Sequence, residues 1–357
     1  MTVFTIAALL LTCSAASTPA ANPIFDHVIV ISVDGLRPDA IDGPEDGALP
    51  GFTRLLHGPH TMQARSDADC TVTLPNHVSM VTSRPVGGPS GHGWTENADP
   101  PAARNGGTLC KNHGAYVTSM FDVAHDHGLK TAIVATKNKF ALLSQSFDEN
   151  EGAPDQDGDD DGKDKVDLFC TAGTSRMARD VATGWFAAHP KRSLLFLHFA
   201  APDVAGHGFG WDMTSGSRYR AAVREVDGEL TALAAMIDAD PALRGHVAIV
   251  LTADHGGGVP LRTHSDCKAS ENFIVPLLIW LGADTAPAEL VALNSDRRAV
   301  LPASEYVGND TIPRPIRNAE VGNVAMQLLG LPAIPGSVAN AKQDLQLIAP
   351  AATKGAP

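Results

Sequence analysis

Six Asp and His side chains stand where they could bind divalent metal ions. Asp34, Asp203 and Asp254 each follow an apolar run of the chain, directly or within a few residues. His207, His255 and His264 complete the set. An Asp that ends an apolar run often only caps or turns the chain. Six such side chains together favour a site where two metal ions hydrolyse an ester, because imidazole and carboxylate are ligands of transition metals.

Thr73 is the hydroxyl side chain best placed to act as a nucleophile. It precedes the step Leu74-Pro75 and a stretch with helical pattern, Val78 to Ser83. Proline is tolerated in a first helical turn, so we expect Thr73 at or near a helix N-terminus. There it could simply cap the helix. Beside a metal ion it could instead attack phosphorus as an alkoxide, and Thr71 is its local competitor.

Elements that could position these side chains alternate along the chain. Apolar, strand-like runs cover 28–33, 131–135, 194–197, 247–252 and 277–280, and helical patterns cover 116–127, 174–189, 219–237 and 319–329. This alternation predicts an α/β fold, a three-layer sandwich with a largely parallel central sheet and helices on both faces. In such sheets ligands bind beyond the carboxyl ends of the strands, where the Asp residues would lie.

The same residues lie in five short motifs. These are Val-Asp-Gly at Asp34, Thr-Leu-Pro-Asn-His from Thr73, Pro-Asp-x-x-Gly-His at Asp203, Ala-Asp-His-Gly-Gly at Asp254 and Thr-His at His264. In this order they resemble the nucleotide pyrophosphatase/phosphodiesterase branch of the alkaline phosphatase superfamily. The resemblance implies an alkaline phosphatase-like fold and two Zn²⁺ or similar ions, with Thr73 as nucleophile. One ion would be bound by Asp34, Thr73, Asp254 and His255, and the other by Asp203, His207 and His264.

The resemblance also implies a phosphoryl-binding Asn, and Asn97 is available. Its distance along the chain from Thr73 is longer than in the family, so an ordinary surface-loop Asn is the alternative. Sulfatases carry an oxidisable Cys or Ser in a Cys-x-Pro-x-Arg context, which Cys70 lacks. Alkaline phosphatases proper offset the extra charge of a monoester with an Arg and a third metal, and no such context surrounds Thr73. We therefore expect a preference for phosphodiesters, including pyrophosphate-linked nucleotides.

The net charge and one acidic segment limit which other partners the protein could bind. The formal net charge of -13 argues against binding of nucleic-acid polymers or anionic membranes. Within the acidic segment near 148–167, Asp157, Asp159, Asp161 and Gly162 match the first positions of an EF-hand-like Ca²⁺ loop. Position 12 is Leu168 rather than Glu. A Ca²⁺ loop and a solvated acidic loop both remain open.

The first residues and the cysteines favour an exported protein. Residues 1–21 resemble a signal peptide without a basic start, so an ordinary terminus is the alternative, and no later stretch is long and apolar enough to span a membrane. We expect one catalytic domain over 22–345, a tail over 346–357, and a secreted or periplasmic location. Beyond Cys13, the even number of cysteines predicts two disulfides or four core thiols, and the preferred pairing is Cys70-Cys110 with Cys170-Cys267.

Three functions are consistent with these features. The favoured one is a secreted two-metal phosphodiesterase or nucleotide pyrophosphatase that hydrolyses a small-molecule phosphoester through a phosphothreonine intermediate. A phosphomonoesterase or phosphonate hydrolase of the same superfamily is the alternative within the enzymes. A non-catalytic, secreted calcium-binding recognition protein is the alternative from another class. The sequence does not indicate an oligomeric state.

Overall fold

The computed structural model describes residues 24–43, 47–98, 107–155, 162–188, 191–283 and 286–349. The predicted signal peptide, most of the predicted tail, and Asp157, Asp159 and Asp161 of the proposed Ca²⁺ loop lie outside these residues. In the described part of the chain, no helix is long and apolar enough to cross a membrane.

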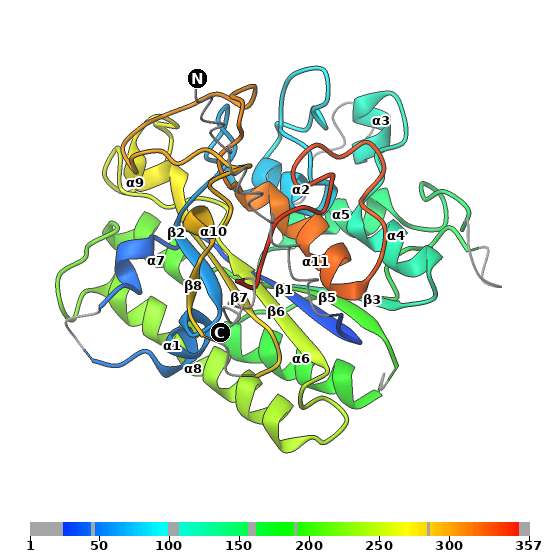
Figure 1. Cartoon of the computed structure of the whole chain (residues 1–357), viewed down its shortest axis with the longest axis horizontal. Helices are drawn as coiled ribbons and strands as arrows, with labels where there is room; N and C mark the ends of the chain where they lie inside the picture. Colours follow the sequence, from blue (N-terminus) through cyan, green and yellow to red (C-terminus); the bar gives the residue numbers. More distant parts are fainter. Residues whose placement is uncertain are drawn as a thin grey trace, which may run out of the picture.

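An eight-stranded sheet forms the centre of the molecule (Figure 1). Its strands lie in the order β4-β3-β5-β1-β6-β7-β2-β8. Only β7 runs antiparallel to its two neighbours among the pairs of the described strands. The bounds are β1 His27–Val33, β2 Pro59–Arg65, β3 Lys130–Ala135, β4 Leu168–Thr171, β5 Ser193–Phe199, β6 Val247–Thr252, β7 Ile274–Trp280 and β8 Ala288–Glu289. The central strands β1, β5 and β6 are buried at every residue, as expected for parallel strands covered on both faces.

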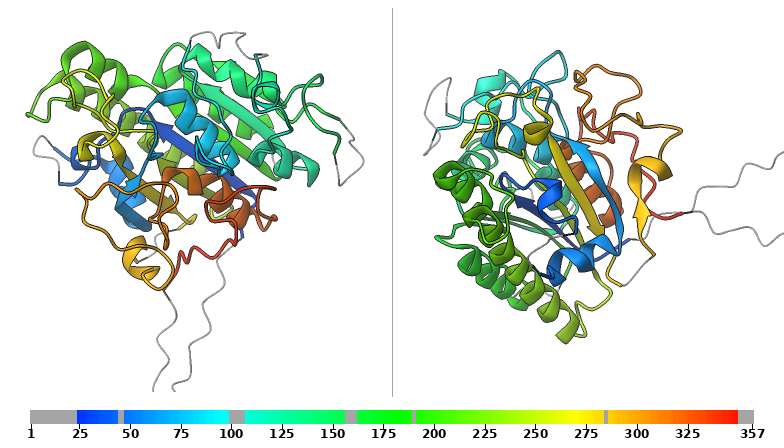
Figure 2. Two further views of the ribbon diagram at one scale, coloured as in Figure 1. Left: turned by 90° about the horizontal axis from the view of Figure 1, so that it is seen from above. Right: turned by 90° about the vertical axis from the view of Figure 1, so that its left-hand side faces the viewer.

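Helices cover both faces of the sheet, and the two views of Figure 2 show the three layers. One layer contains α1 Pro50–Leu56, α6 Ser175–Ala188 and α8 Arg218–Ala239, with α7 Ala201–Phe209 packed on α8; the other contains α2 Thr73–Thr82, α4 Met120–Asp126 and α11 Val321–Leu329. Shorter helices connect these layers: α3 Leu109–His113, α5 Ala141–Ser146, α9 Ser270–Phe273, α10 Leu290–Leu293, and the 3-10 turns η1 Pro38–Ala40, η3 Asn138–Phe140 and η4 Asn318–Glu320. The predicted three-layer α/β fold with a largely parallel sheet is confirmed.

Local sequence explains where the helices begin. The hydroxyl of Ser217 accepts a hydrogen bond from the N–H of Arg220 and caps α8, whose buried residues recur at helical spacing from Tyr219 to Ile237. The helical pattern from Tyr116 predicts an earlier start for α4 than the structure has. Ser119 and Asp122 form a capping box, so that helix begins at Met120.

The four cysteines in the described residues are free thiols, and the two expected disulfides are not formed there. Burial raises the pKa of the Cys70 thiol to about 12, and nearby Cys267 is one of the groups that raise it further. The sulfur of Cys110, the expected partner of Cys70, instead accepts a hydrogen bond from the backbone of Val117. Cys267 is therefore the cysteine that lies near Cys70.

Candidate metal centre

The ends of three neighbouring parallel strands bring five of the predicted ligands together. Asp34 follows β1 directly, and Asp254 and His255 come just after β6. Asp203 and His207 lie one turn apart on α7, which begins where β5 ends, so both side chains project from the same side of that helix. Because β5, β1 and β6 are adjacent and parallel, these residues meet at one edge of the sheet.

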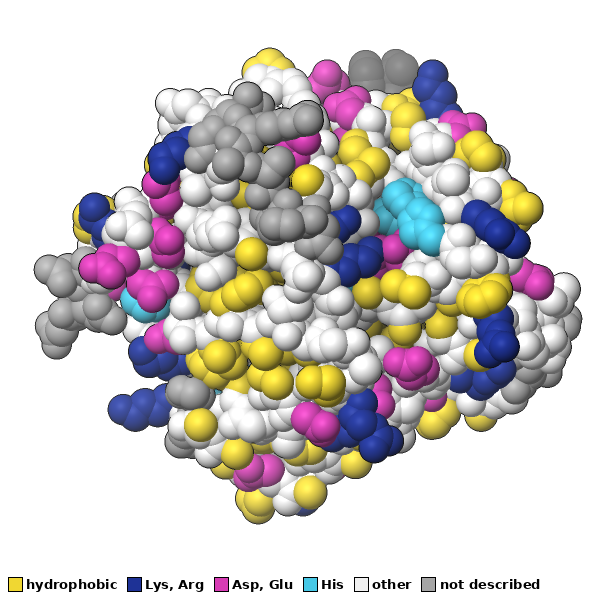
Figure 3. Space-filling view, turned by 180° about the vertical axis from the view of Figure 1, so that it is seen from behind, with side chains coloured by type: hydrophobic (Ala, Val, Ile, Leu, Met, Phe, Trp, Pro, Cys, Tyr) yellow, Lys and Arg dark blue, Asp and Glu magenta, His cyan; other side chains and the backbone are white. Residues whose placement is uncertain are grey.

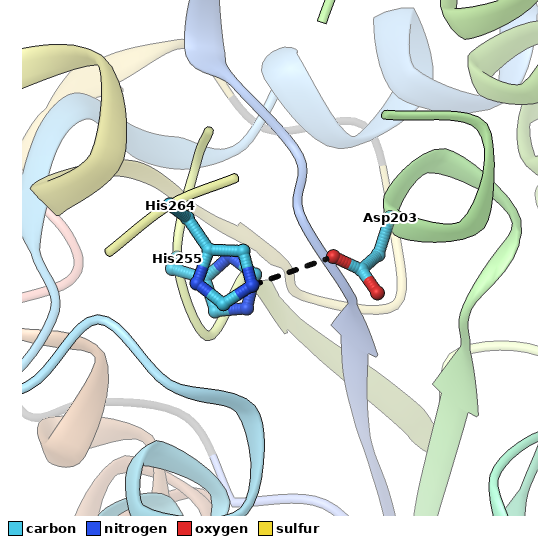
Figure 4. Close-up of side chains that lie close together, drawn as sticks. All are labelled: Asp203, His255 and His264. Carbon is cyan, nitrogen blue, oxygen red and sulfur yellow. Dashed lines mark ion pairs between the residues drawn. The ribbon is translucent and has the colours of Figure 1, made fainter. Parts of the chain in front are cut away.

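His264 reaches the same edge from a loop. Its Nδ1 atom makes a short hydrogen bond with the carbonyl oxygen of Thr71, and the hydroxyl of Thr71 donates one back to the carbonyl oxygen of His264. Its ring stacks on that of His255 at a centroid distance of 3.6 Å, facing Asp203 (Figure 4). The two hydrogen bonds between His264 and Thr71 fix the position of the His264 imidazole relative to the segment that precedes Thr73.

The first predicted ligand group converges on the Nε2 atom of His255. This nitrogen lies 3.2 Å from Oδ2 of Asp254, 3.6 Å from Oδ1 of Asp34 and 3.5 Å from the hydroxyl oxygen of Thr73. All four side chains are buried. Their facing atoms are close enough for one ion to contact them together, and Asp34, Asp254 and His255 form a cluster of metal-ligand geometry.

The second predicted group converges on Oδ1 of Asp203. This oxygen lies 3.3 Å from Nε2 of His207 and 3.9 Å from Nε2 of His264, and the two imidazole nitrogens are 3.3 Å apart. Asp203 and His264 also cluster with His255, which thus stands between the two groups. The side chain of His207 is 46% exposed, so this group lies on the open side of the site. Histidine side chains gather in a hollow of the surface in Figure 3, with basic and acidic side chains beside them.

Each buried carboxylate uses one oxygen for protein contacts and leaves the other without a partner. Oδ2 of Asp34 accepts hydrogen bonds from Lys137 and His198, Oδ2 of Asp203 accepts one from Lys137, and Oδ1 of Asp254 accepts the N–H groups of Gly35 and His255. The opposite oxygens, which face the imidazoles, have no hydrogen-bond partner. Unpartnered buried oxygens are rare in proteins, and these three fit metal ions.

The imidazoles present the complementary atoms. The Nδ1 atoms of His255 and His207 bond to the backbone oxygens of Gly256 and Arg262 at 2.8 and 2.9 Å, and that of His264 bonds to Thr71. Because a backbone oxygen only accepts, each Nδ1 carries the proton and each Nε2 keeps its lone pair. Burial lowers the pKa of His255, and burial together with His255 lowers the pKa of His264 to about 3, so both rings stay neutral.

The charges of the cluster do not balance within the protein. Burial opposes ionisation of Asp34, yet the ammonium of Lys137 and a hydrogen bond from His198 hold the pKa of that carboxyl well below its usual range. Burial and the negative charge of Asp34 raise the pKa of Asp254 well above its usual range. Three carboxylates thus share one ammonium, and bound cations would supply the missing positive charge.

Thr73 is the first residue of α2 and does not cap it. Val72 occupies the N-cap position and its side chain makes no capping bond, so the interpretation of Thr73 as the N-cap residue is wrong. The competing hydroxyl of Thr71 is already bonded to the backbone of His264. Asn76 holds the loop before the helix through bonds to the carbonyl oxygens of Cys70 and Val72. Thr73 is thus the hydroxyl whose oxygen faces His255.

Asn97 lies at the N-terminus of α2, beside Thr73. Its Oδ1 atom accepts the N–H of Leu74 at 3.0 Å and the ammonium of Lys139 at 3.1 Å. Asn97 is thus a loop residue that contacts the N-terminus of α2, and this position suits the predicted contact with a phosphoryl oxygen.

Three site residues were missed in the sequence: Lys137, Lys139 and His198. His198, the last residue but one of β5, bonds Asp34, and the lysines follow the end of β3, the strand next to β5. The strand order is the signal that could have indicated them, because β3 ends at the same edge of the sheet.

This sheet, with clustered Asp and His side chains and a buried Thr at its carboxyl edge, defines an α/β protein with a candidate metal centre beside a hydroxyl group. The sequence profile of the type I phosphodiesterase / nucleotide pyrophosphatase family matches residues 28–260. The chain therefore belongs to this family. No curated protein matches the sequence.

Solved structures share the fold at low sequence identity. A putative sulfatase from Bacteroides fragilis aligns with a TM-score of 0.58 and 14% identity, over 93% of this chain and 80% of that protein. A putative sulfatase from Bacteroides thetaiotaomicron aligns with a TM-score of 0.56 and 13% identity, over 91% and 74%. Murine ectonucleotide pyrophosphatase / phosphodiesterase 5 aligns over 64% of this chain and 57% of that protein, with 21% identity and a TM-score of 0.42.

Proposed function

We propose that the protein is an exported phosphoester hydrolase that uses two Zn²⁺ or similar ions and transfers a phosphoryl group from a small molecule to Thr73. The observation that carries this proposal is the set of three unpartnered carboxylate oxygens that face neutral imidazoles around the Thr73 hydroxyl. Hydrolysis of phosphodiesters, the reaction for which the family is named, is the first candidate.

Asp34, Asp254, His255 and the Thr73 oxygen would hold one ion, and Asp203, His207 and His264 would hold the other. When bound, such ions lower the pKa of a nucleophile and stabilise the charge on a departing oxygen. The buried carboxylates and the neutral Nε2 atoms are the donor set that zinc prefers. His198, through its bond to Asp34, fixes the orientation of that carboxylate.

The chain's own residues account for a covalent route. The Thr73 oxygen, after its proton is lost to solvent, forms a bond to phosphorus while the bond from phosphorus to the leaving oxygen breaks. Water then cleaves the phosphothreonine ester and frees Thr73. The amide nitrogen of Asn97, whose oxygen is fixed by Leu74 and Lys139, would hold a phosphoryl oxygen during both steps.

The central test compares Thr73→Ala with Thr71→Ala. Thr73→Ala should abolish turnover of bis-p-nitrophenyl phosphate because no other group can form the covalent bond, while zinc content and folding persist. Acid quenching of the wild-type enzyme during turnover, followed by mass spectrometry, should find phosphate on the peptide that contains Thr73. Near-normal turnover by Thr73→Ala together with an inactive Thr71→Ala would contradict the assignment.

One observation favours a second candidate, a phosphomonoesterase or phosphonate hydrolase. The expectation of diesters depended on finding no additional cation near Thr73, and the structure has the ammonium of Lys139 there, bonded to Asn97. The third candidate, a non-catalytic recognition protein, would explain neither the unpartnered oxygens nor the arrangement around Thr73. Zinc analysis together with an ester panel separates it from both enzymes.

Export is proposed from the composition of the first 21 residues. Expression of the full chain with fractionation of the cells, followed by N-terminal sequencing of the mature protein, tests it. A mature chain that begins near residue 22 in the periplasm or medium supports export, and an intact Met1 in the cytoplasm contradicts it.

A further inference from the structure

Two lysines follow β3 and project into the edge of the sheet that carries the candidate metal centre. Lys137 is the N-cap residue of η3, and Lys139 is the second residue of that turn. Side chains two residues apart in this segment face different partners, so each ammonium has to be considered separately.

The charge of Lys137 is already used by the protein. Its ammonium donates hydrogen bonds to Oδ2 of Asp34 at 2.6 Å and Oδ2 of Asp203 at 2.7 Å. These two carboxylates belong to different predicted metal groups, so Lys137 connects the groups. With two anionic neighbours in contact, its charge is neutralised and is not available to a substrate.

The charge of Lys139 is not neutralised in the same way. Its ammonium donates to the neutral amide oxygen of Asn97, and in the described residues no carboxylate lies within ion-pair distance of it. The side chain is half-buried, and burial together with the charge of Lys137 lowers the pKa of Lys139. A partly desolvated cation without an anionic partner is suited to bind an anion.

The position of Lys139 indicates which anion it would meet. Asn97 receives both Lys139 and the N–H of Leu74 on one oxygen, so the ammonium lies at the N-terminus of α2, next to Thr73. Any phosphoryl group attacked by Thr73 has its non-bridging oxygens in this neighbourhood. The N-terminus of a helix adds further positive potential there.

We propose that Lys139 is a specificity-determining residue that binds the additional anionic oxygen of a phosphomonoester or phosphonate dianion. A phosphodiester has an ester group in place of that oxygen and carries one negative charge less. Lys139 therefore favours dianionic phosphoryl substrates over diesters, within the hydrolase function proposed above, on which this inference depends.

The test compares p-nitrophenyl phosphate with methyl p-nitrophenyl phosphate, which share a leaving group and differ in one charge. In the wild-type enzyme, the ratio of kcat/KM for the monoester to kcat/KM for the diester should be higher than in Lys139→Met, to the extent that one hydrogen bond between charged groups allows. Lys139→Met should lower kcat/KM for the monoester by about 10- to 100-fold and for the diester by less than about threefold. Lys139→Arg should retain much of the preference.

Lys342→Met is the matched control, because it removes an exposed lysine outside the candidate metal centre. It should change kcat/KM for neither substrate. Equal losses for both esters in Lys139→Met would overturn the proposal. Zinc content measured in each variant shows whether a loss of activity is a loss of metal.

A binding experiment separates this proposal from the hydrolase function. Titration calorimetry on zinc-loaded protein with inorganic phosphate and with dimethyl phosphate measures charge selection without turnover. Lys139→Met should weaken phosphate binding by about tenfold or more and leave dimethyl phosphate nearly unchanged. If the enzyme hydrolyses neither ester, the proposed function fails, while unchanged phosphate affinity in Lys139→Met is the result that overturns the role of Lys139.

Discussion

Replacing Lys137 with Met tests whether the buried carboxylates of the site depend on this ammonium when metal is absent. The ammonium contacts Asp34 and Asp203 at 2.6 and 2.7 Å, and its side chain is 16% exposed. At an effective dielectric constant of about 20, each contact corresponds to a Coulomb energy of about 6 kcal/mol before desolvation is subtracted. Breaking a buried pair by removing one partner costs about 3 to 5 kcal/mol in measured cases, which we take as the net effect.

The expected result depends on metal. In chelated protein, Lys137→Met leaves two buried carboxylates without their cation, so the free energy of unfolding should fall by about 3 to 5 kcal/mol. In zinc-loaded protein the bound ions supply positive charge, and only the hydrogen bonds are lost, which costs about 1 kcal/mol. At about 2 to 4 °C of Tm per kcal/mol, the value for somewhat shorter chains, Tm should fall by about 6 to 20 °C in chelator and by about 2 to 4 °C with zinc.

The assay is thermal unfolding followed by circular dichroism, in EDTA and in Zn²⁺. Arg298→Met is the control, because the guanidinium of Arg298 is also buried and pairs with two carboxylates, Glu320 and Asp344, that are not among the candidate metal ligands. Its Tm loss should be the same with and without zinc. A Tm loss in Lys137→Met that is equally large in both conditions would refute the argument that bound cations and Lys137 balance the same charges.

Three further predictions concern packing, pH and the thiols. Gly257→Ala would place its new carbon 2.1 Å from a tryptophan ring, so it should destabilise the fold by about 1 to 3 kcal/mol in urea unfolding. Gly184→Ala, within a helix and with nothing within 4 Å, should instead stabilise it by about 0.5 to 1 kcal/mol, and a loss from this control would contradict the packing argument. A hydrogen bond from Arg54 lowers the pKa of Asp238 in the folded protein. The pair therefore stabilises the folded state above the unfolded pKa of about 4, and this stabilisation is lost as the pH falls through the lower folded pKa. Asp238→Asn should therefore lower the unfolding free energy by about 0.5 kcal/mol at pH 7 and by less at pH 3, and an equal loss at both pH values would count against the pair. Peptide mapping after treatment with oxidised glutathione should find Cys70 joined to Cys267, whereas another partner for Cys70 would show that their proximity does not direct the bond.

The central part of the fold could be predicted because its strands are buried at every position and mostly apolar. The runs at 28–33 and 247–252 became β1 and β6 almost residue for residue. The strands β2, β4 and β8 were not predicted. Two of them, β4 and β8, end the sheet, where a strand is short and partly exposed and carries little hydrophobic signal. In β2, residues such as His60 and Gln63 are partly exposed, which hides the pattern in the same way.

The candidate ligands could be predicted because they lie in short, ordered motifs at the ends of apolar runs. Lys137 and Lys139 could not, because nothing in Ala135-Thr136-Lys137-Asn138-Lys139 distinguishes a surface loop from a site. Their placement depends on β3 pairing with β5, a contact between distant parts of the chain. The same holds for His198, whose role follows from the pairing of β5 with β1.

The wide separation of the predicted ligands along the chain has a consequence for handling the protein. Neither group of ligands exists in any single segment: Asp34 and Asp254 meet only when β1 and β6 pair, and His264 arrives through its bonds to Thr71. An unfolded or half-assembled chain would offer zinc only scattered, weak contacts, so affinity appears together with the native sheet. The ratio of tightly bound zinc to protein would then report the fraction of natively folded molecules. The quality of a purified sample could be judged from its metal content before any substrate is known.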